Sequence, residues 1–149
     1  MARHLKIAIC GASALGVTRP VLRRLIRFVA AGEGRKIDHV DLAVVDAREM
    51  ARLNRRYLGR RGSTDVLSFD LADRPGGLNA QVLICAGAVS RQARAHGHSR
   101  ARELALCIVH GLLHLTGHDD ATPPKAAAMH ARQEQLLAQF TAREKRRRR

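Results

Sequence analysis

The segment at residues 110–120 constrains the fold more than any other part of the sequence. It reads HGLLHLTGHDD and continues an apolar helical pattern that begins near residue 99. Because an α-helix turns about 100° per residue, His110 and His114 project from the same helix face, one turn apart. We expect Gly117 to end this helix, so that the following chain can bring His118 or Asp120 to the same point. Three protein ligands and one open position are the layout of a catalytic zinc site.

Two other interpretations of this segment remain open. A pair of histidines four residues apart can also be a hydrogen-bonded pair in a helical core, with no metal. Zinc peptidases of the HExxH type carry a glutamate beside the first histidine as general base. Here that position is Gly111, which argues against a peptidase of that type.

Short apolar strands and amphipathic helices alternate in the first part of the chain, and helices dominate the rest. We expect strands at residues 5–10, 40–45, 65–71 and 81–85. We expect helices at residues 19–31, 47–57 and 87–95, a helix capped by Ser99 that carries the histidines, and a last helix from residue 123 into the basic tail. This order predicts the α+β class: a single domain with a small mixed sheet of about four strands, packed with about five helices.

The charge of the chain points to a polyanionic partner. The formal net charge is +14 over 149 residues, and an excess of this size favours nucleic acid, although a basic protein can simply be well solvated. The run from 145 to 149 supplies five of these positive charges. We therefore divide the chain into a domain at residues 1–142 and a basic C-terminal tail at residues 143–149, which can bind RNA electrostatically or remain solvated.

The cysteines and the N-terminal segment indicate in which cellular compartment we expect the protein. The three cysteines are scattered, form no CxxC pair and fit apolar strand or helix patterns, which indicates core thiols in a reducing compartment. The apolar stretch after Lys6 is short and interrupted by glycine, unlike a signal peptide. No apolar run is long enough to span a membrane. We expect a cytoplasmic protein.

Three other groups of residues are candidates for function. Glu103 lies seven residues before His110 and so on the same helix face, where it can orient a ligand histidine or simply favour the first helical turn. Arg55, Arg56, Arg60 and Arg61 gather at one helix end and its loop; they predict a phosphate-contacting rim, or else a solvated helix face. The segment from Gly11 to Gly16 follows a strand and precedes a helix, as a phosphate-binding loop does, but Val17 occupies the position where a P-loop needs lysine.

With these residues in view, the chain resembles the YbeY family of metal-dependent endoribonucleases. Three segments carry the resemblance: LNRRY at 53–57 followed by STDVLSF at 63–69, the strand VLIC at 82–85, and HGLLHLTG at 110–117. Their order and spacing cover roughly residues 40 to 120.

The resemblance implies an α+β fold with the histidine helix beside a cleft. It implies one zinc ion per chain, held by His110, His114 and Asp120, with His118 as a fallback ligand; the family has a third histidine where this chain has Asp120. His110 and His114 would be the catalytic residues. The family's usual active-site arginine falls at Leu58. The implied activity is single-strand-specific RNA cleavage near the 3′ end of small-subunit ribosomal RNA, with that RNA and the small subunit as partners. The alternative is a non-catalytic ribosomal-RNA-binding factor with a structural or vacant metal site.

Overall fold

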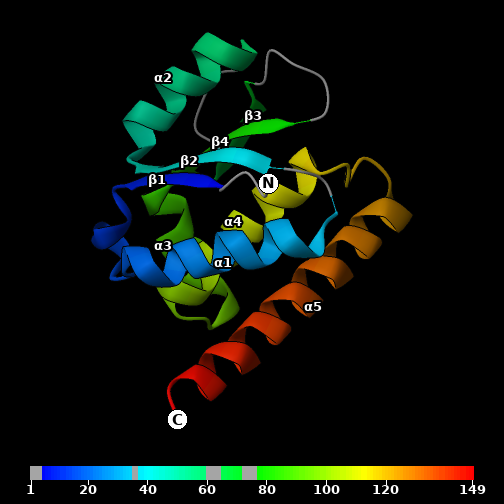
Figure 1. The fold of residues 1–149 in the computed structure, drawn as a ribbon. Helices are drawn as coiled ribbons and strands as arrows, with labels where there is room; N and C mark the ends of the chain where they lie inside the picture. Colours follow the sequence, from blue (N-terminus) through cyan, green and yellow to red (C-terminus); the bar gives the residue numbers. More distant parts are fainter. Residues whose placement is uncertain (1–4, 35–36, 60–64, 72–76) are drawn as a thin grey trace.

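A four-stranded mixed sheet lies at the centre of the molecule (Figure 1). The structure is a computed structural model that describes residues 5–34, 37–59, 65–71 and 77–149. The strands are β1 (Lys6–Cys10), β2 (Ile37–Val45), β3 (Val66–Asp70) and β4 (Leu78–Cys85), in the spatial order β1-β2-β4-β3. β1 and β2, and β2 and β4, pair in parallel, whereas β3 pairs with β4 in the antiparallel sense. Parallel neighbours need crossover connections, which the helices supply.

Five α-helices and one short 3₁₀ helix complete the described elements. They are η1 (Ala12–Leu15), α1 (Arg19–Gly32), α2 (Ala47–Leu58), α3 (Ala86–His96), α4 (Arg100–Leu115) and α5 (Pro123–Arg147). Pro20 lies in the first turn of α1, where its missing N–H costs nothing. The Asp46 and Thr122 side chains accept hydrogen bonds from the backbones of α2 and α5 at their first turns.

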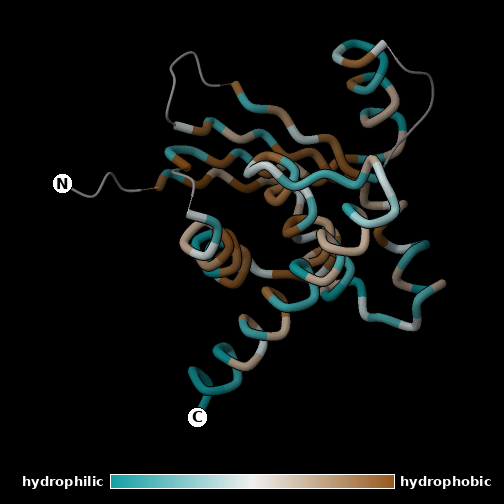
Figure 2. The backbone as a smooth tube through the Cα atoms, turned by 90° about the vertical axis from the view of Figure 1, so that its right-hand side faces the viewer, coloured by the Kyte–Doolittle hydropathy of each residue, from teal (hydrophilic) through white to brown (hydrophobic). Residues whose placement is uncertain are grey.

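Both faces of the sheet are buried, and the side chains of alternate β4 residues point to opposite faces. Val82 and Ile84 join the larger core with buried residues of α1, α4 and α5. Leu83 and Cys85 join a smaller core on the other face with Met50 of α2. Figure 1 shows this layering, with α2 on one side of the strands and α1, α4 and α5 on the other. In Figure 2 the strands carry hydrophobic stretches interrupted by hydrophilic residues, whereas the end of α5 is hydrophilic.

The predicted fold class and architecture are confirmed, with small differences at the element ends. β4 begins at Leu78, three residues earlier than expected, because Leu78 pairs with Ile37 of β2. Residues 143–147 continue α5, so the greater part of the basic tail is helical. Among the described helices, none combines the length and the apolar character needed to cross a membrane.

The link from β1 to α1 is a strand–turn–helix connection. Gly11 has a φ of +80°, and a β-carbon there would collide with the Val44 backbone carbonyl. Glycine is therefore required by the close approach of two backbones. Cys85 and Cys107 are buried as expected, but the expectation of a core thiol was wrong for Cys10, which is exposed at the end of β1.

Candidate metal centre

Helix α4 positions the two histidines at the edge of the larger core. Its first turn is capped by the Ser99 hydroxyl, which accepts a hydrogen bond from the Arg102 N–H at 3.1 Å. Its apolar side packs against β3, β4 and α1, with Leu104, Ile108 and Leu112 fully buried. The helix ends at Leu115, two residues before Gly117, whose φ is +110°.

His110, His114 and Asp120 converge on one point. The Nε2 atoms of the two histidines lie 3.1 Å apart. Asp120 lies 3.9 Å from His110 Nε2 through Oδ2 and 3.7 Å from His114 Nε2 through Oδ1. Two ligands of a tetrahedral zinc ion are about 3.3 Å apart, given bonds of about 2.0–2.2 Å. The donor set and its spacing therefore fit a zinc-type ion.

The three side chains of His110, His114 and Asp120 are partly exposed, which would allow a bound ion to contact a substrate. The side chains of His110 and His114 are 35% and 34% exposed, and that of Asp120 is 51% exposed. His110 also lines a cavity of about 520 Å³ bounded by α3, α4 and α5. An ion held here keeps an open side, as catalytic zinc sites do and structural ones do not.

Gln133 of α5 contacts His110 but is not one of the three candidate ligands. Its Oε1 lies 3.2 Å from Nδ1 of His110. An Nδ1–H that donates to this oxygen leaves Nε2 without a proton, with its lone pair free for a metal. Sequence reasoning missed Gln133, because it lies 23 residues from His110 and no local pattern links α5 to α4.

The loop after α4 is held by contacts with α1 and α5. His118 Nε2 lies 2.8 Å from a carboxylate oxygen of Glu33, and Arg132 donates to the other oxygen at 2.8 Å. Asp119 accepts from the Ala121 N–H and pairs with Lys125. These contacts turn His118 toward Glu33, and Asp120, not His118, completes the group around the histidine pair. His118 as a fallback ligand stays a prediction.

The partners of Glu33 set the pKa of its carboxyl group. Burial acts to raise this pKa, but the hydrogen bonds from Arg132 and His118 outweigh burial and hold it below the ordinary value of 4.5. The Glu33 side chain is only 6% exposed. The anchor of the loop is thus a buried charged group that stays ionised.

Comparison with known proteins decides the family. A family model described as "Endoribonuclease YbeY" matches residues 16–141. The chain belongs to the YbeY family. A relative from Moorella thermoacetica named "Endoribonuclease YbeY" is 43% identical over 78% of this chain and 83% of its own length. Relatives of the same name from Mycobacterium bovis and Frankia alni are 32% and 37% identical, covering 93% and 80% of this chain and 85% and 73% of theirs.

A solved structure agrees with the fold. The solution structure of a Thermotoga maritima protein superposes with a TM-score of 0.64 at 25% sequence identity, covering 97% of this chain and 93% of that one. The resemblance to the YbeY family inferred from three short segments is therefore confirmed over most of the chain.

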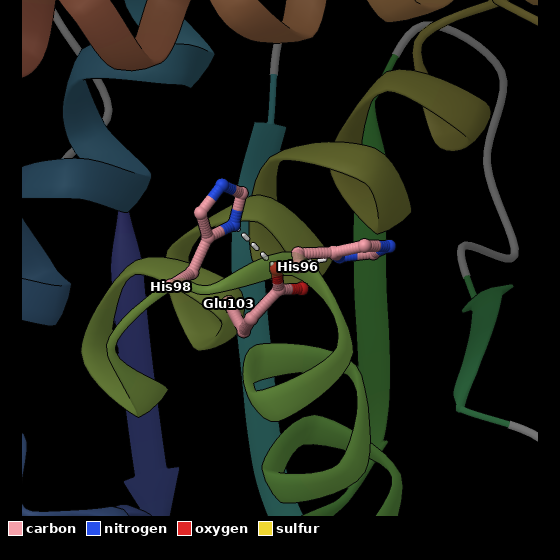
Figure 3. A group of neighbouring side chains, drawn as sticks. All are labelled: His96, His98 and Glu103. Carbon is pink, nitrogen blue, oxygen red and sulfur yellow. Dashed lines mark hydrogen bonds and ion pairs between the residues drawn. The ribbon is translucent and has the colours of Figure 1, made fainter.

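Glu103 contacts two histidines at the junction of α3 and α4. Glu103 is 3% exposed, and its Oε1 lies 2.9 Å from His96 Nδ1 and 2.6 Å from His98 Nδ1 (Figure 3). It lines the same cavity as His110, and an effect on that histidine stays a prediction. Sequence reasoning did not single out His96 and His98, although their spacing around Gly97 was a usable signal.

The predicted RNA-contacting arginines of the YbeY-type segment are only partly described. Arg55 and Arg56 are exposed in the last turn of α2, and Arg56 lies 5.5 Å from the centre of the Tyr57 ring. Arg60 and Arg61 lie outside the described residues. Leu58, the position at which the resemblance implies an arginine, is 44% exposed at the end of α2.

Proposed function

We propose that this chain is a single-strand-specific, metal-dependent endoribonuclease that acts in the maturation of small-subunit ribosomal RNA. The observation that carries the proposal is the convergence of His110, His114 and Asp120 on one point, in a chain of the YbeY family. The relatives' printed name supports RNA as the substrate. The net charge of +14 supports a polyanionic partner.

The ligand side chains have distinct roles in this proposal. His110 and His114 present Nε2 lone pairs, Gln133 fixes the tautomer of His110, and Asp120 contributes the negative charge. A zinc-type ion, when bound, lowers the pKa of water and polarises a phosphodiester oxygen. With aspartate in place of a third histidine, the ligand set carries one negative charge, which offsets part of the charge of a divalent ion.

Two basic surfaces are proposed to hold the RNA backbone. The first is the rim of Arg55, Arg56, Arg60 and Arg61. The second is a groove of about 650 Å³ between α1 and α5. Its lining includes five arginines and two phenylalanines: Arg24, Arg27, Arg143, Arg146, Arg147, Phe28 and Phe140. Arg24 is paired there with Glu144 at 2.7 Å. Arginines beside aromatic rings suit phosphate contact and base stacking.

Metal content and RNA cleavage together test the proposal. The protein would be purified without chelator and supplied with zinc, and the metal measured for wild type, His114→Ala, Asp120→Ala and Asp120→His. We expect wild type and Asp120→His to hold zinc at the centre and to cleave a single-stranded RNA bearing the small-subunit 3′ end, but not its duplex. His114→Ala and Asp120→Ala should lose that zinc and the cleavage.

The control variant is His130→Ala, an exposed histidine of α5 that lines the same cavity. It should keep both zinc and activity. RNA affinity should survive in all variants, since the arginines are untouched. A wild-type protein that binds the RNA but holds no zinc and cuts nothing would refute the nuclease and leave a non-catalytic ribosomal-RNA-binding factor.

A further inference from the structure

A second cluster of metal-ligand side chains lies where α3 passes into α4. His96 is the last residue of α3, Gly97 has a φ of +67°, His98 follows, and Glu103 lies in the first turn of α4. The positive φ of Gly97 turns the chain sharply, so that both imidazoles reach the same carboxylate (Figure 3).

The two rings approach this carboxylate from different directions. Their centroids lie 5.6 Å apart and their planes are inclined by 56°, yet both Nδ1 atoms lie within 2.9 Å of Glu103 Oε1. Two histidines and one glutamate, each offering one donor atom within 4.8 Å of the others, are a known ligand set of open zinc sites.

Burial and charge favour a cation at this cluster. Glu103 is 3% exposed, whereas His96 and His98 are 57% and 30% exposed. Its two recorded ion-pair partners are these histidines, which are neutral unless protonated. The described residues that line the adjoining cavity include Asp65, Glu103 and Glu134 but neither lysine nor arginine. A buried carboxylate in such surroundings favours a bound cation over a phosphate.

We propose that His96, His98 and Glu103 form a second divalent-cation site of the zinc type, independent of the centre at His110, His114 and Asp120. The measured separations of 2.6 and 2.9 Å fit hydrogen bonds. Around an ion the donor atoms stand about 3.3 Å apart, so the two imidazoles, which are 57% and 30% exposed, would move outward by about 0.4 to 0.7 Å. The fourth position opens toward the cavity that His110 also lines.

The two sites are separate and not one dinuclear centre. Glu103 and His110 are seven residues apart on α4, which is about 10 Å along a helix axis. Metal ions that act jointly on one phosphate lie about 3.5–4 Å apart. The second ion would instead join the end of α3 to the start of α4 and add positive charge to the wall of the shared cavity.

Zinc stoichiometry of the full-length chain tests this site. In a His110→Ala, His114→Ala, Cys10→Ser background, which removes the first centre and the exposed thiol, we expect one zinc per chain by equilibrium dialysis and elemental analysis. Adding His96→Ala should abolish that zinc, and this exposed residue can be changed without disturbing the core. Adding His130→Ala, which lines the same cavity, should leave it. Glu103→Gln should weaken binding at least ten-fold.

Thermal unfolding in the same background gives a second readout. Zinc at about 100 times Kd should raise the midpoint by about 5–10 °C, and His96→Ala should abolish the rise. A background chain that binds no zinc, or one in which His96→Ala changes neither stoichiometry nor midpoint, would overturn the second site. Failure of the first centre is distinguishable: wild type would then lose all its zinc with His96→Ala and none with His110→Ala.

Discussion

Replacing Gln133 should weaken zinc binding at the His110 centre without touching a ligand. Gln133→Leu keeps a side chain of similar size but removes the oxygen that lies 3.2 Å from His110 Nδ1. The imidazole then loses the partner that fixes its tautomer and orientation. Losses of such outer partners reduce metal affinity by about 10–100-fold.

The geometry places the expected effect near the lower end of this range. A separation of 3.2 Å is at the long end for an N–H···O hydrogen bond. The His110 side chain is also 35% exposed, so water can take the place of the amide oxygen in the variant. We therefore expect about a ten-fold increase in the zinc Kd, which corresponds to about 1.4 kcal/mol.

Competition against a chromophoric zinc chelator would measure this difference, in a His96→Ala background that removes the second site. The matched control is Gln135→Leu, because Gln135 is an exposed glutamine on the same helix that contacts Arg132. Gln135→Leu should leave the Kd unchanged, and Gln133→Glu should keep or tighten it, since a carboxylate accepts the same hydrogen bond more strongly. Equal zinc affinity in Gln133→Leu and wild type would refute the role assigned to Gln133.

Four further predictions rest on other parts of the structure. Glu33→Gln should lower the free energy of unfolding by about 1–3 kcal/mol at neutral pH, as urea titrations would measure. Because the pKa of Glu33 is held below 4.5, the difference in stability from wild type should shrink as the pH falls below about 4.5. A difference that stays constant with pH would contradict this prediction. The double variant Arg143→Ala, Arg147→Ala should weaken RNA binding and reduce the slope of log K against log salt concentration by about 1.4. The double variant Arg55→Ala, Arg56→Ala should have the same effect. An unchanged slope for either variant would show that its surface does not contact the RNA backbone. Burial, with the nearby charges of Asp65 and Glu103, raises the pKa of the Cys107 thiol to about 12, so a thiol reagent at mildly alkaline pH should label Cys10 and spare Cys107, as peptide mapping would verify. Gly111→Ala should destabilise the fold by about 1–2 kcal/mol in denaturant unfolding, since its β-carbon would lie 2.8 Å from Ser68 Oγ and 3.2 Å from Val82 Cγ1. Unchanged stability would mean that the Ser68 and Val82 side chains move aside without cost, and would contradict this prediction.

The sequence predicted the elements better than their contacts. Helix α4 and its cap at Ser99 were predictable because apolar periodicity and capping are local properties. The proximity of His110 and His114 was predictable for the same reason, since one helical turn separates them. The strand order β1-β2-β4-β3 was not predicted, because pairing depends on packing between distant segments.

The missed residues of the site share one property. Gln133 lies 23 residues from His110, and Glu33 lies 85 residues from His118. Such pairs leave no periodicity or motif in a single sequence. The exposed position of Cys10 was missed for a related reason: β1 is an edge strand, and an apolar pattern does not distinguish an edge strand from a central one.

The supports of the His110 centre have a consequence for the order in which the protein matures during synthesis. The three proposed ligands lie on α4 and in the loop after it, but Gln133 and Arg132 belong to α5, which leaves the ribosome later. A nascent chain that has just exposed Asp120 carries every proposed ligand, yet lacks both the amide that contacts His110 and the guanidinium that pairs with Glu33. In the proposed metal centre, such a chain would hold zinc more weakly than a chain in which α5 has docked. Synthesis of α5 would then be the step after which the proposed centre reaches its full affinity for metal.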